Sequence, residues 1–247
     1  MSMEGIYERF PSEAMGRDMH VWRYGWWGAP VMVFPSAAGF AHEWQKEGMI
    51  DALAPLLRGG KIKLYCPESN VAEAFTREGS GDEKIAKHLR YERFILETMV
   101  PLIRRDCSLP NARIGVVGCS LGGLYAALFA LKHPEIFNYA LCMSGRYEIS
   151  QFLGGHNASD VYFNNPLSFV PNLRGEALER VRRTHLTMVC GRGNYEEGCI
   201  EETLAMCDHL RAKGIPHDRD IWGQESAHHW SWWKKQTLTH LTRVYAR

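Results

Sequence analysis

Ser120 lies in the run GCSLGG at positions 118–123, which contains the pattern G-x-S-x-G. A serine hydroxyl is a weak nucleophile unless a base takes its proton and backbone donors receive the charge that develops on the substrate. Glycines two positions before and after the serine allow a bend tight enough to present the hydroxyl to both. The spacing predicts a nucleophile, with the N–H of Leu121 as one donor to an oxyanion.

The residues on either side of Ser120 have the patterns of a strand and a helix. Residues 114–117, IGVV, form an apolar and mostly β-branched run, which is typical of a strand buried on both faces. Apolar residues then recur at helical spacing from Leu124 to Leu131. A strand, G-x-S-x-G and a helix in this order predict a nucleophile elbow.

Two adjacent histidines are candidates for the base. In the fold that carries such an elbow, the partners of the serine follow it along the chain, first the acid and then the histidine, at the carboxyl ends of strands. His228 and His229 follow a predicted strand at 217–222. Because the closing helix is predicted over 229–245, His229 is placed to cap or flank it. We therefore predict His228 as the base, and His229 remains the alternative.

Two adjacent glutamates are candidates for the acid. The acid should lie in a loop, where it can hold the imidazole in one tautomer and stabilise the imidazolium. Glu196 and Glu197 follow the predicted strand before that of the histidines, at the start of a helix predicted over 196–213. Glu196 fits the loop position, whereas Glu197 fits a first-turn residue favoured by the helix dipole. Asp160 and Asp220 are more distant candidates.

The second oxyanion donor should come from the loop after the apolar strand predicted at 30–35. This loop, SAAG at 36–39, has small side chains that leave room for a substrate carbonyl. The backbone N–H of Ala37 is the predicted donor, and that of Ala38 is the alternative. The same four residues are also compatible with a simple tight turn.

Strands alternate with helices along the whole chain of 247 residues, which predicts an α/β fold with a mostly parallel, doubly wound sheet. We expect one domain over 1–247. Residues 144–183 have no clear periodicity, and we expect them to form a short irregular insert, or cap, over the site after the sixth strand. The other segments read as helices are 42–57 and 84–106.

The composition and charge of the chain limit the kinds of partner that we expect. A net charge of +1 gives no reason to expect nucleic acid or an anionic membrane, and no run reaches the 18 apolar residues of a membrane span. The N-terminus has no apolar signal segment, and the seven cysteines form no C-x-x-C pair, so we expect a cytoplasmic protein. Nothing in the sequence bears on the oligomeric state.

No cofactor or metal is predicted. His228 and His229 could bind a metal ion together with His20, His42 or Glu225, but no H-E-x-x-H or comparable spacing supports this. Four tryptophans lie near the end of the sequence, Trp222, Trp230, Trp232 and Trp233. One interpretation is an aromatic wall for a ligand, and the other is that Trp230 and Trp233 pack the last helix onto the sheet at i, i+3 spacing.

Five runs resemble the putative-esterase family of α/β-hydrolases, in the branch of esterase D-like enzymes and antigen 85 mycolyltransferases. They are PSAAG at 35–39, GCSLGG at 118–123, SGRY at 144–147, VYFNNP at 161–166 and HHWSWW at 228–233. The resemblance implies an α/β-hydrolase fold with Ser120 as nucleophile, Glu196 as acid and His228 as base. It departs from the family at Cys119, where such proteins often have histidine, and at His229, where the subgroup often has aspartate.

The expected function is that of a serine esterase, which cleaves the carboxylic ester of a small molecule through an acyl-enzyme intermediate. Acyl transfer to an alcohol is an alternative suggested by the antigen 85 resemblance. A binding protein that keeps the fold without the chemistry is a second alternative.

Overall fold

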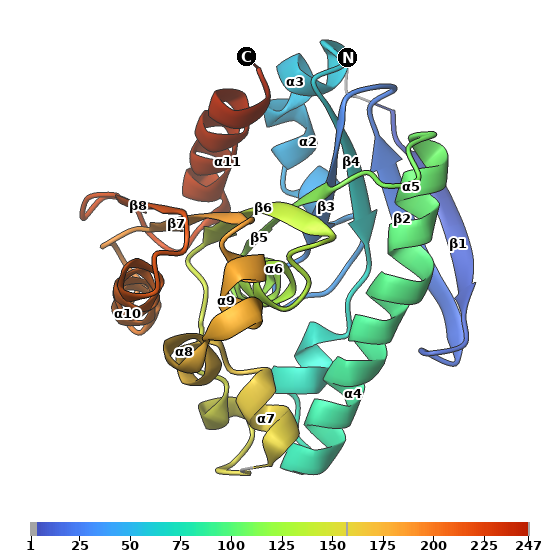
Figure 1. Cartoon of the computed structure of the whole chain (residues 1–247). Coiled ribbons are helices and arrows are strands. Elements are labelled where there is room, and N and C mark those ends of the chain that lie inside the picture. Colours follow the sequence, from blue (N-terminus) through green and yellow to red (C-terminus); the bar gives the residue numbers. More distant parts are fainter. Residues whose placement is uncertain (1–3, 157, 247) are drawn as a thin grey trace.

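The computed structural model describes residues 4–156 and 158–246. A single eight-stranded sheet runs through it in the order β1-β2-β4-β3-β5-β6-β7-β8, with helices on both sides (Figure 1). β1 and β2 are antiparallel to their neighbours, whereas the six strands β3 to β8 are parallel to one another. The strands are β1 Ile6–Ser12, β2 Arg17–Tyr24, β3 Ala29–Phe34, β4 Ile62–Pro67, β5 Ile114–Cys119, β6 Phe137–Met143, β7 His185–Cys190 and β8 His217–Ile221.

The central strand β5 shows why the sheet is buried on both faces. All six of its residues are buried. Ile114 and Val116 pack into the larger of two apolar clusters, whereas Val117 and Cys119 pack into the smaller one. Because successive side chains of a strand point to opposite faces, the apolar run supplies both cores at once.

The helices divide between the two faces of the sheet. The larger cluster includes residues of α4 (Gly81–Phe94), α5 (Val100–Asp106), α6 (Leu121–Lys132), α9 (Gly175–Val181) and α10 (Cys199–Ala212). The smaller one includes residues of α1 (Glu43–Lys46), α2 (Met49–Ala52), α3 (Ala54–Arg58) and α11 (Trp230–Tyr245). The predicted doubly wound sheet of an α/β-hydrolase fold is therefore confirmed. None of the described helices has the length and apolar character needed to cross a bilayer.

The single helix expected over 42–57 is wrong. Three short helices, α1 to α3, occupy this segment. Gly48 separates the first two with a φ of 74°, a conformation that suits glycine. Pro55 then lies in the first turn of α3, where its missing N–H breaks no helical hydrogen bond. The breaks let the segment turn so that it follows the sheet.

The segment between β6 and β7 is built from short helical pieces. It contains two 3₁₀ turns, Ser150–Phe152 and Val170–Asn172, and the helices α7 (Ser159–Phe163), α8 (Pro166–Phe169) and α9. The segment expected to be irregular is thus largely helical, in pieces of at most seven residues. Such pieces show little periodicity in a sequence because each has only one or two turns.

Asn164 connects this segment to the rest of the fold. Its carboxamide oxygen lies 2.9 Å from Nε2 of His88 on α4 and accepts a hydrogen bond of 2.5 Å from Nζ of Lys132 on α6. Burial lowers the pKa of His88 to about 4, so the imidazole is neutral near pH 7. The Asn-containing run that supports the family resemblance thus ties the segment to two helices.

Candidate active site

Ser120 lies at a strained bend between β5 and α6. Its backbone has φ 57° and ψ −128°, outside the regions that L-residues usually occupy. A Cβ at position 118 would collide with the backbone of Gly122, and one at position 122 would collide with the carbonyls of Phe34 and Pro35. Both glycines are therefore required by close backbone contacts, and together they form the predicted elbow.

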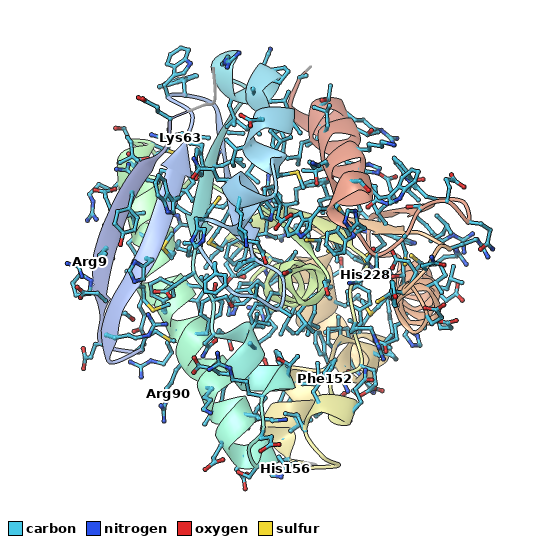
Figure 2. All side chains as sticks on the ribbon, turned by 180° about the vertical axis from the view of Figure 1, so that it is seen from behind. Arg9, Lys63, Arg90, Phe152, His156 and His228 are labelled. Atoms are coloured by element: carbon cyan, nitrogen blue, oxygen red, sulfur yellow. The ribbon has the colours of Figure 1, made fainter. Side chains whose placement is uncertain are left out.

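The imidazole of His228 meets the Ser120 hydroxyl. Nε2 lies 3.0 Å from Oγ of Ser120, within hydrogen-bond distance. The backbone N–H of His228 donates to the carbonyl of Asn194 at 3.0 Å, which joins two loops at this edge of the sheet. Figure 2 shows His228 beside the end at which α11 begins. His229 instead caps α11, where its Nδ1 accepts from the N–H of Ser231.

Glu196 lies on the other side of the imidazole. Its Oε2 is 3.3 Å from Nδ1 of His228, and its side chain is only 1% exposed. The helix expected to start at Glu196 begins at Cys199, so Glu196 lies in the loop and Glu197, which is exposed, is not a helical residue. Gly198 directly precedes that helix with a φ of 80°, a conformation that favours glycine. The structure therefore brings Glu196 to His228 and leaves Glu197 in solvent.

The two more distant acid candidates belong to other contacts. Asp160 lies exposed in the first turn of α7. Asp220 is on β8, where one of its oxygens accepts from Nε1 of Trp222 and lies 2.9 Å from Nε2 of His240. Asp220 thus links β8 to α11.

Glu196 accepts from the thiol of Cys190 at 3.3 Å and is also surrounded by two residues that the sequence analysis did not assign. The hydroxyl of Ser144, which is fully buried, donates to Oε1 of Glu196 at 2.7 Å. Nε1–H of Trp233 donates to the Ser144 oxygen at 3.1 Å, and the Trp233 ring packs edge-on against His228 with centroids 4.7 Å apart. A chain of contacts therefore runs from Trp233 through Ser144 and Glu196 to His228 and Ser120.

Ser144 also has an unusual backbone. Its φ is 49°, and its N–H donates to the carbonyl of Val189 on β7. It follows β6 directly, at the carboxyl ends of the parallel strands, so its place in the chain is a signal that could have found it. Trp233 lies five residues after His228 and one turn after Trp230, against which it packs at 5.1 Å. The packing interpretation of these two tryptophans therefore describes their contacts, and Trp233 has a polar role in addition.

The loop after β3 lies against the first turn of α6. The close approach of Gly122 to the carbonyls of Phe34 and Pro35 brings the loop next to Leu121, the first residue of that helix. Ala37 is half-buried and Ala38 is exposed. Ala37 thus lies deeper in the loop than its alternative.

A buried carboxyl group holds this loop. Glu43 on α1 accepts from the N–H of Ser36 at 2.7 Å, and its other oxygen is 2.5 Å from the Ser36 hydroxyl. Its side chain is 5% exposed, and burial raises the pKa of Glu43, while the two contacts with Ser36 oppose that shift. Glu43 thereby fixes the residue directly before Ala37.

The groups of metal ligands considered from the sequence are not the group that the structure brings together. Within residues 4–156 and 158–246, one group of three potential ligands comes together, and it consists of Glu196, Cys199 and His228. Their ligand atoms lie within 4.8 Å of one another.

Comparisons with known proteins identify the family of the chain. An α/β-hydrolase fold with a serine, a histidine and a glutamate at the carboxyl ends of its strands is typical of serine hydrolases. The family described as putative esterase matches residues 12–244, and the chain belongs to that family.

Individual relatives are more distant. The chain is 26% identical over 220 residues to diacylglycerol acyltransferase/mycolyltransferase Ag85B of Mycobacterium leprae, a match that covers 77% of this chain and 64% of that protein. The match thus spans less than two thirds of the relative.

Solved structures share the fold. A ferulic acid esterase superposes with a TM-score of 0.78 at 14% identity and covers 99% of this chain and 98% of its own. FphF, a fluorophosphonate-binding serine hydrolase of Staphylococcus aureus, superposes with a TM-score of 0.76 at 15% identity and covers 99% of both chains.

Proposed function

We propose that this member of the esterase family hydrolyses carboxylic esters of small molecules through an acyl-enzyme formed on Ser120. The observation that carries the proposal is the 3.0 Å contact between the Ser120 hydroxyl and Nε2 of His228, made at a strained elbow. Serine, imidazole and carboxylate in this sequence of contacts are the parts that acyl transfer requires.

In the proposed first half-reaction, His228 takes the proton of Ser120 through Nε2 while Oγ attacks the acyl carbon. The tetrahedral intermediate collapses when the imidazolium returns its proton to the departing alcohol oxygen, which leaves the acyl group on Ser120. In the second half-reaction His228 activates a water molecule, and the acid and free serine are released. Glu196 accepts the Nδ1–H of His228 throughout and stabilises the imidazolium.

The negative charge on the substrate oxygen is proposed to be held by the N–H groups of Leu121 and Ala37. Leu121 opens α6, where the partial positive charge of the helix N-terminus adds to its hydrogen bond. Ala37 follows Ser36, whose hydrogen bonds with Glu43 fix the loop. Preorganised donors of this kind contribute about 10²–10³ each to kcat.

The test of the proposal is the substitution Ser120→Ala. We expect it to abolish turnover of p-nitrophenyl acetate and butyrate, with an unchanged circular dichroism spectrum. A fluorophosphonate probe should label the wild-type protein and fail to label the variant. The matched control is Ser159→Ala, at an exposed serine of α7, which should keep full activity and labelling. If the Ser120→Ala variant turns over these esters at the wild-type rate, Ser120 takes no part in the mechanism.

Acyl transfer to an alcohol is the second candidate. It is supported by the 26% identity to a protein whose name includes acyltransferase and mycolyltransferase. Both reactions share the acyl-enzyme and differ only in the acceptor that attacks it. Product analysis with p-nitrophenyl butyrate and added glycerol separates them, because a transferase yields mainly glyceryl ester, whereas a hydrolase yields mainly butyrate.

The proposed location is the cytoplasm. All seven cysteines are free thiols, six of them buried, which fits a reducing compartment. The net charge of +1 favours small-molecule substrates over a polyanionic partner.

A further inference from the structure

Three potential metal ligands meet on the side of His228 that faces away from Ser120. Nδ1 of His228 lies 3.3 Å from Oε2 of Glu196 and 3.9 Å from Sγ of Cys199. The three atoms come from the loop after β7, the first residue of α10 and the loop before α11. Glu196 and Cys199 are 1% and 4% exposed, so the group is protected from bulk water.

One of the separations already equals that around a tetrahedral zinc ion, and all three ligand atoms lie within 4.8 Å of one another. With bonds of about 2.3 Å to sulfur, 2.0 Å to nitrogen and 2.1 Å to oxygen, tetrahedral geometry places the ligand atoms roughly 3.3–3.6 Å apart. The nitrogen-to-oxygen distance is already 3.3 Å, and the nitrogen-to-sulfur distance of 3.9 Å exceeds the requirement by a few tenths of an ångström. Cys199 therefore has to move toward the other two ligands when the ion binds.

The chemistry of the ligands also favours zinc. Thiolate, imidazole and carboxylate are the donors that Zn²⁺ takes in proteins, whereas Mg²⁺ and Ca²⁺ take oxygen. We infer that Glu196, Cys199 and His228 form an inhibitory zinc site within the active site. Carboxylate and thiolate together neutralise the ion.

Binding has a defined proton balance. Burial raises the pKa of the Cys199 thiol to about 12, so the thiol is protonated in the free protein, and a bound zinc ion displaces that proton. The ring hydrogen that Nδ1 of His228 shares with Glu196 moves to Nε2 by exchange with water. Each Zn²⁺ therefore binds with the net release of one proton.

The same tautomer change explains inhibition. With zinc on Nδ1, Nε2 carries a proton and points it at the Ser120 oxygen. It can no longer accept the proton of the serine, so the base is lost while the fold is unchanged. This consequence rests on the proposed function, whereas the binding of zinc does not.

The experiment measures zinc binding and activity on the full chain. Isothermal titration calorimetry with ZnCl₂ should give one site on the wild-type protein, and p-nitrophenyl acetate turnover should fall with the same apparent affinity. EDTA should restore activity, and MgCl₂ should have no effect. Loss of a residue that merely supports a metal ligand costs about 10–100-fold in affinity, so Cys199→Ala, which removes a ligand, should weaken both binding and inhibition at least about 100-fold.

The controls test the assignment of the thiol. Cys107→Ser, at a half-buried cysteine that contacts Tyr65, should bind zinc like the wild type. Cobalt(II) should give a thiolate-to-metal charge-transfer band in the wild-type protein and in Cys107→Ser. The band should be absent in Cys199→Ala and in Cys199→Ser, which serves if the alanine variant fails to fold.

The two proposals fail in different ways. If the wild-type protein has no esterase activity but binds zinc through Cys199, the proposed function is wrong and the zinc site stands. An active wild-type protein that zinc does not inhibit, or that zinc inhibits equally after Cys199→Ala or Cys199→Ser, overturns the zinc site. Absence of the cobalt band from the wild-type protein also overturns it.

Discussion

Two buried glutamates flank the strand that carries Ser120, and their local structures are similar. Glu196 follows β7 and Glu43 follows β3, with β5 between them in the sheet. Glu196 accepts from the hydroxyl of Ser144 at 2.7 Å, and Glu43 lies 2.5 Å from the hydroxyl of Ser36. Each carboxyl group is at most 5% exposed.

The difference lies in their remaining neighbours. Glu196 contacts an imidazole that becomes charged in the proposed mechanism, so its own charge is compensated when the barrier is crossed. Glu43 contacts a backbone N–H and a hydroxyl, which stay neutral throughout. Burial of a carboxyl group beside a serine therefore does not by itself indicate catalysis. The group it faces decides whether it acts on the reaction or on the shape of a loop.

The largest expected effect is that of Glu196→Gln. An amide of the same shape cannot stabilise the imidazolium and can stabilise the wrong tautomer, so kcat/KM should fall roughly 10³–10⁴-fold. Initial rates with p-nitrophenyl acetate measure it. The control is Glu197→Gln at the exposed neighbour, which should stay within a factor of two. Equal losses in the two variants would erase the distinction between these adjacent glutamates.

A smaller loss is expected at Glu43. Glu43→Ala removes the acceptor of the Ser36 N–H and frees the loop that carries Ala37, so kcat should fall roughly 10–100-fold, below the cost of a complete oxyanion donor. Glu43→Gln keeps an acceptor of the same shape, and we expect it to retain activity within a factor of five. If the glutamine variant loses as much as Glu196→Gln does, the charge of Glu43 takes part in the reaction and the comparison is broken.

Ser144, which donates to Glu196, should contribute less to kcat/KM. Ser144→Ala removes one hydrogen bond to the carboxylate, and we expect kcat/KM to fall roughly 10-fold, which corresponds to the lower end of the about 1.5–3 kcal/mol that a hydrogen bond to a charged group contributes. The carboxylate then attracts a proton on the imidazole more strongly. The acidic limb of the pH–rate profile should therefore move to higher pH.

Trp233→Phe serves as the matched variant, because it keeps a ring against His228 and loses only the N–H to Ser144. Its profile should lie between those of Ser144→Ala and the wild type. A Ser144→Ala profile that loses height without moving along the pH axis would show that Ser144 acts only on packing.

The smallest expected effect is one on stability. Because burial raises the pKa of Glu43 in the folded protein, its contribution to stability is complete below the ordinary carboxyl range near pH 4.5 and is lost as the pH rises through the folded value. Glu43→Gln does not titrate. The free energy of unfolding of the variant, relative to that of the wild type, should therefore increase between pH 4 and pH 7.

Urea unfolding at the two pH values measures this difference. Glu197→Gln, at an exposed side chain, should show a difference from the wild type that is the same at both pH values. A relative stability of Glu43→Gln that falls toward pH 7 would mean that the Glu43 carboxylate is better stabilised by Ser36 than burial allows.

The elements of the fold that could be predicted are those with a strong local pattern. The apolar run of β5, the glycines around Ser120 and the alternation of strands and helices were sufficient for the elbow and the doubly wound sheet, and the family resemblance implied the α/β-hydrolase fold. The prediction of one helix over 42–57 was wrong because it rested on apolar residues at helical spacing. It did not take into account that Gly48 adopts a positive φ or that Pro55 starts a new helix. Short helices between β6 and β7 had too few turns to show a period.

The three principal residues of the candidate site could be predicted from their order along the chain. The topology of a parallel sheet places the loops of Ser120, Glu196 and His228 at one edge, and this needs no side-chain coordinates. Ser144 and Trp233 could not be found in this way. Their contacts depend on the positive φ after β6 and on how α11 packs on the smaller cluster, which are properties of the assembled tertiary structure.

The position of His228 next to the start of α11 has a consequence for biosynthesis. Ser120 and Glu196 leave the ribosome before His228, and the indole that supports their contacts follows on α11. In the proposed mechanism, a nascent chain that has folded its sheet before α11 docks therefore has the nucleophile but not its base. The proposed mechanism thus predicts that such a chain turns over no ester until α11 has docked.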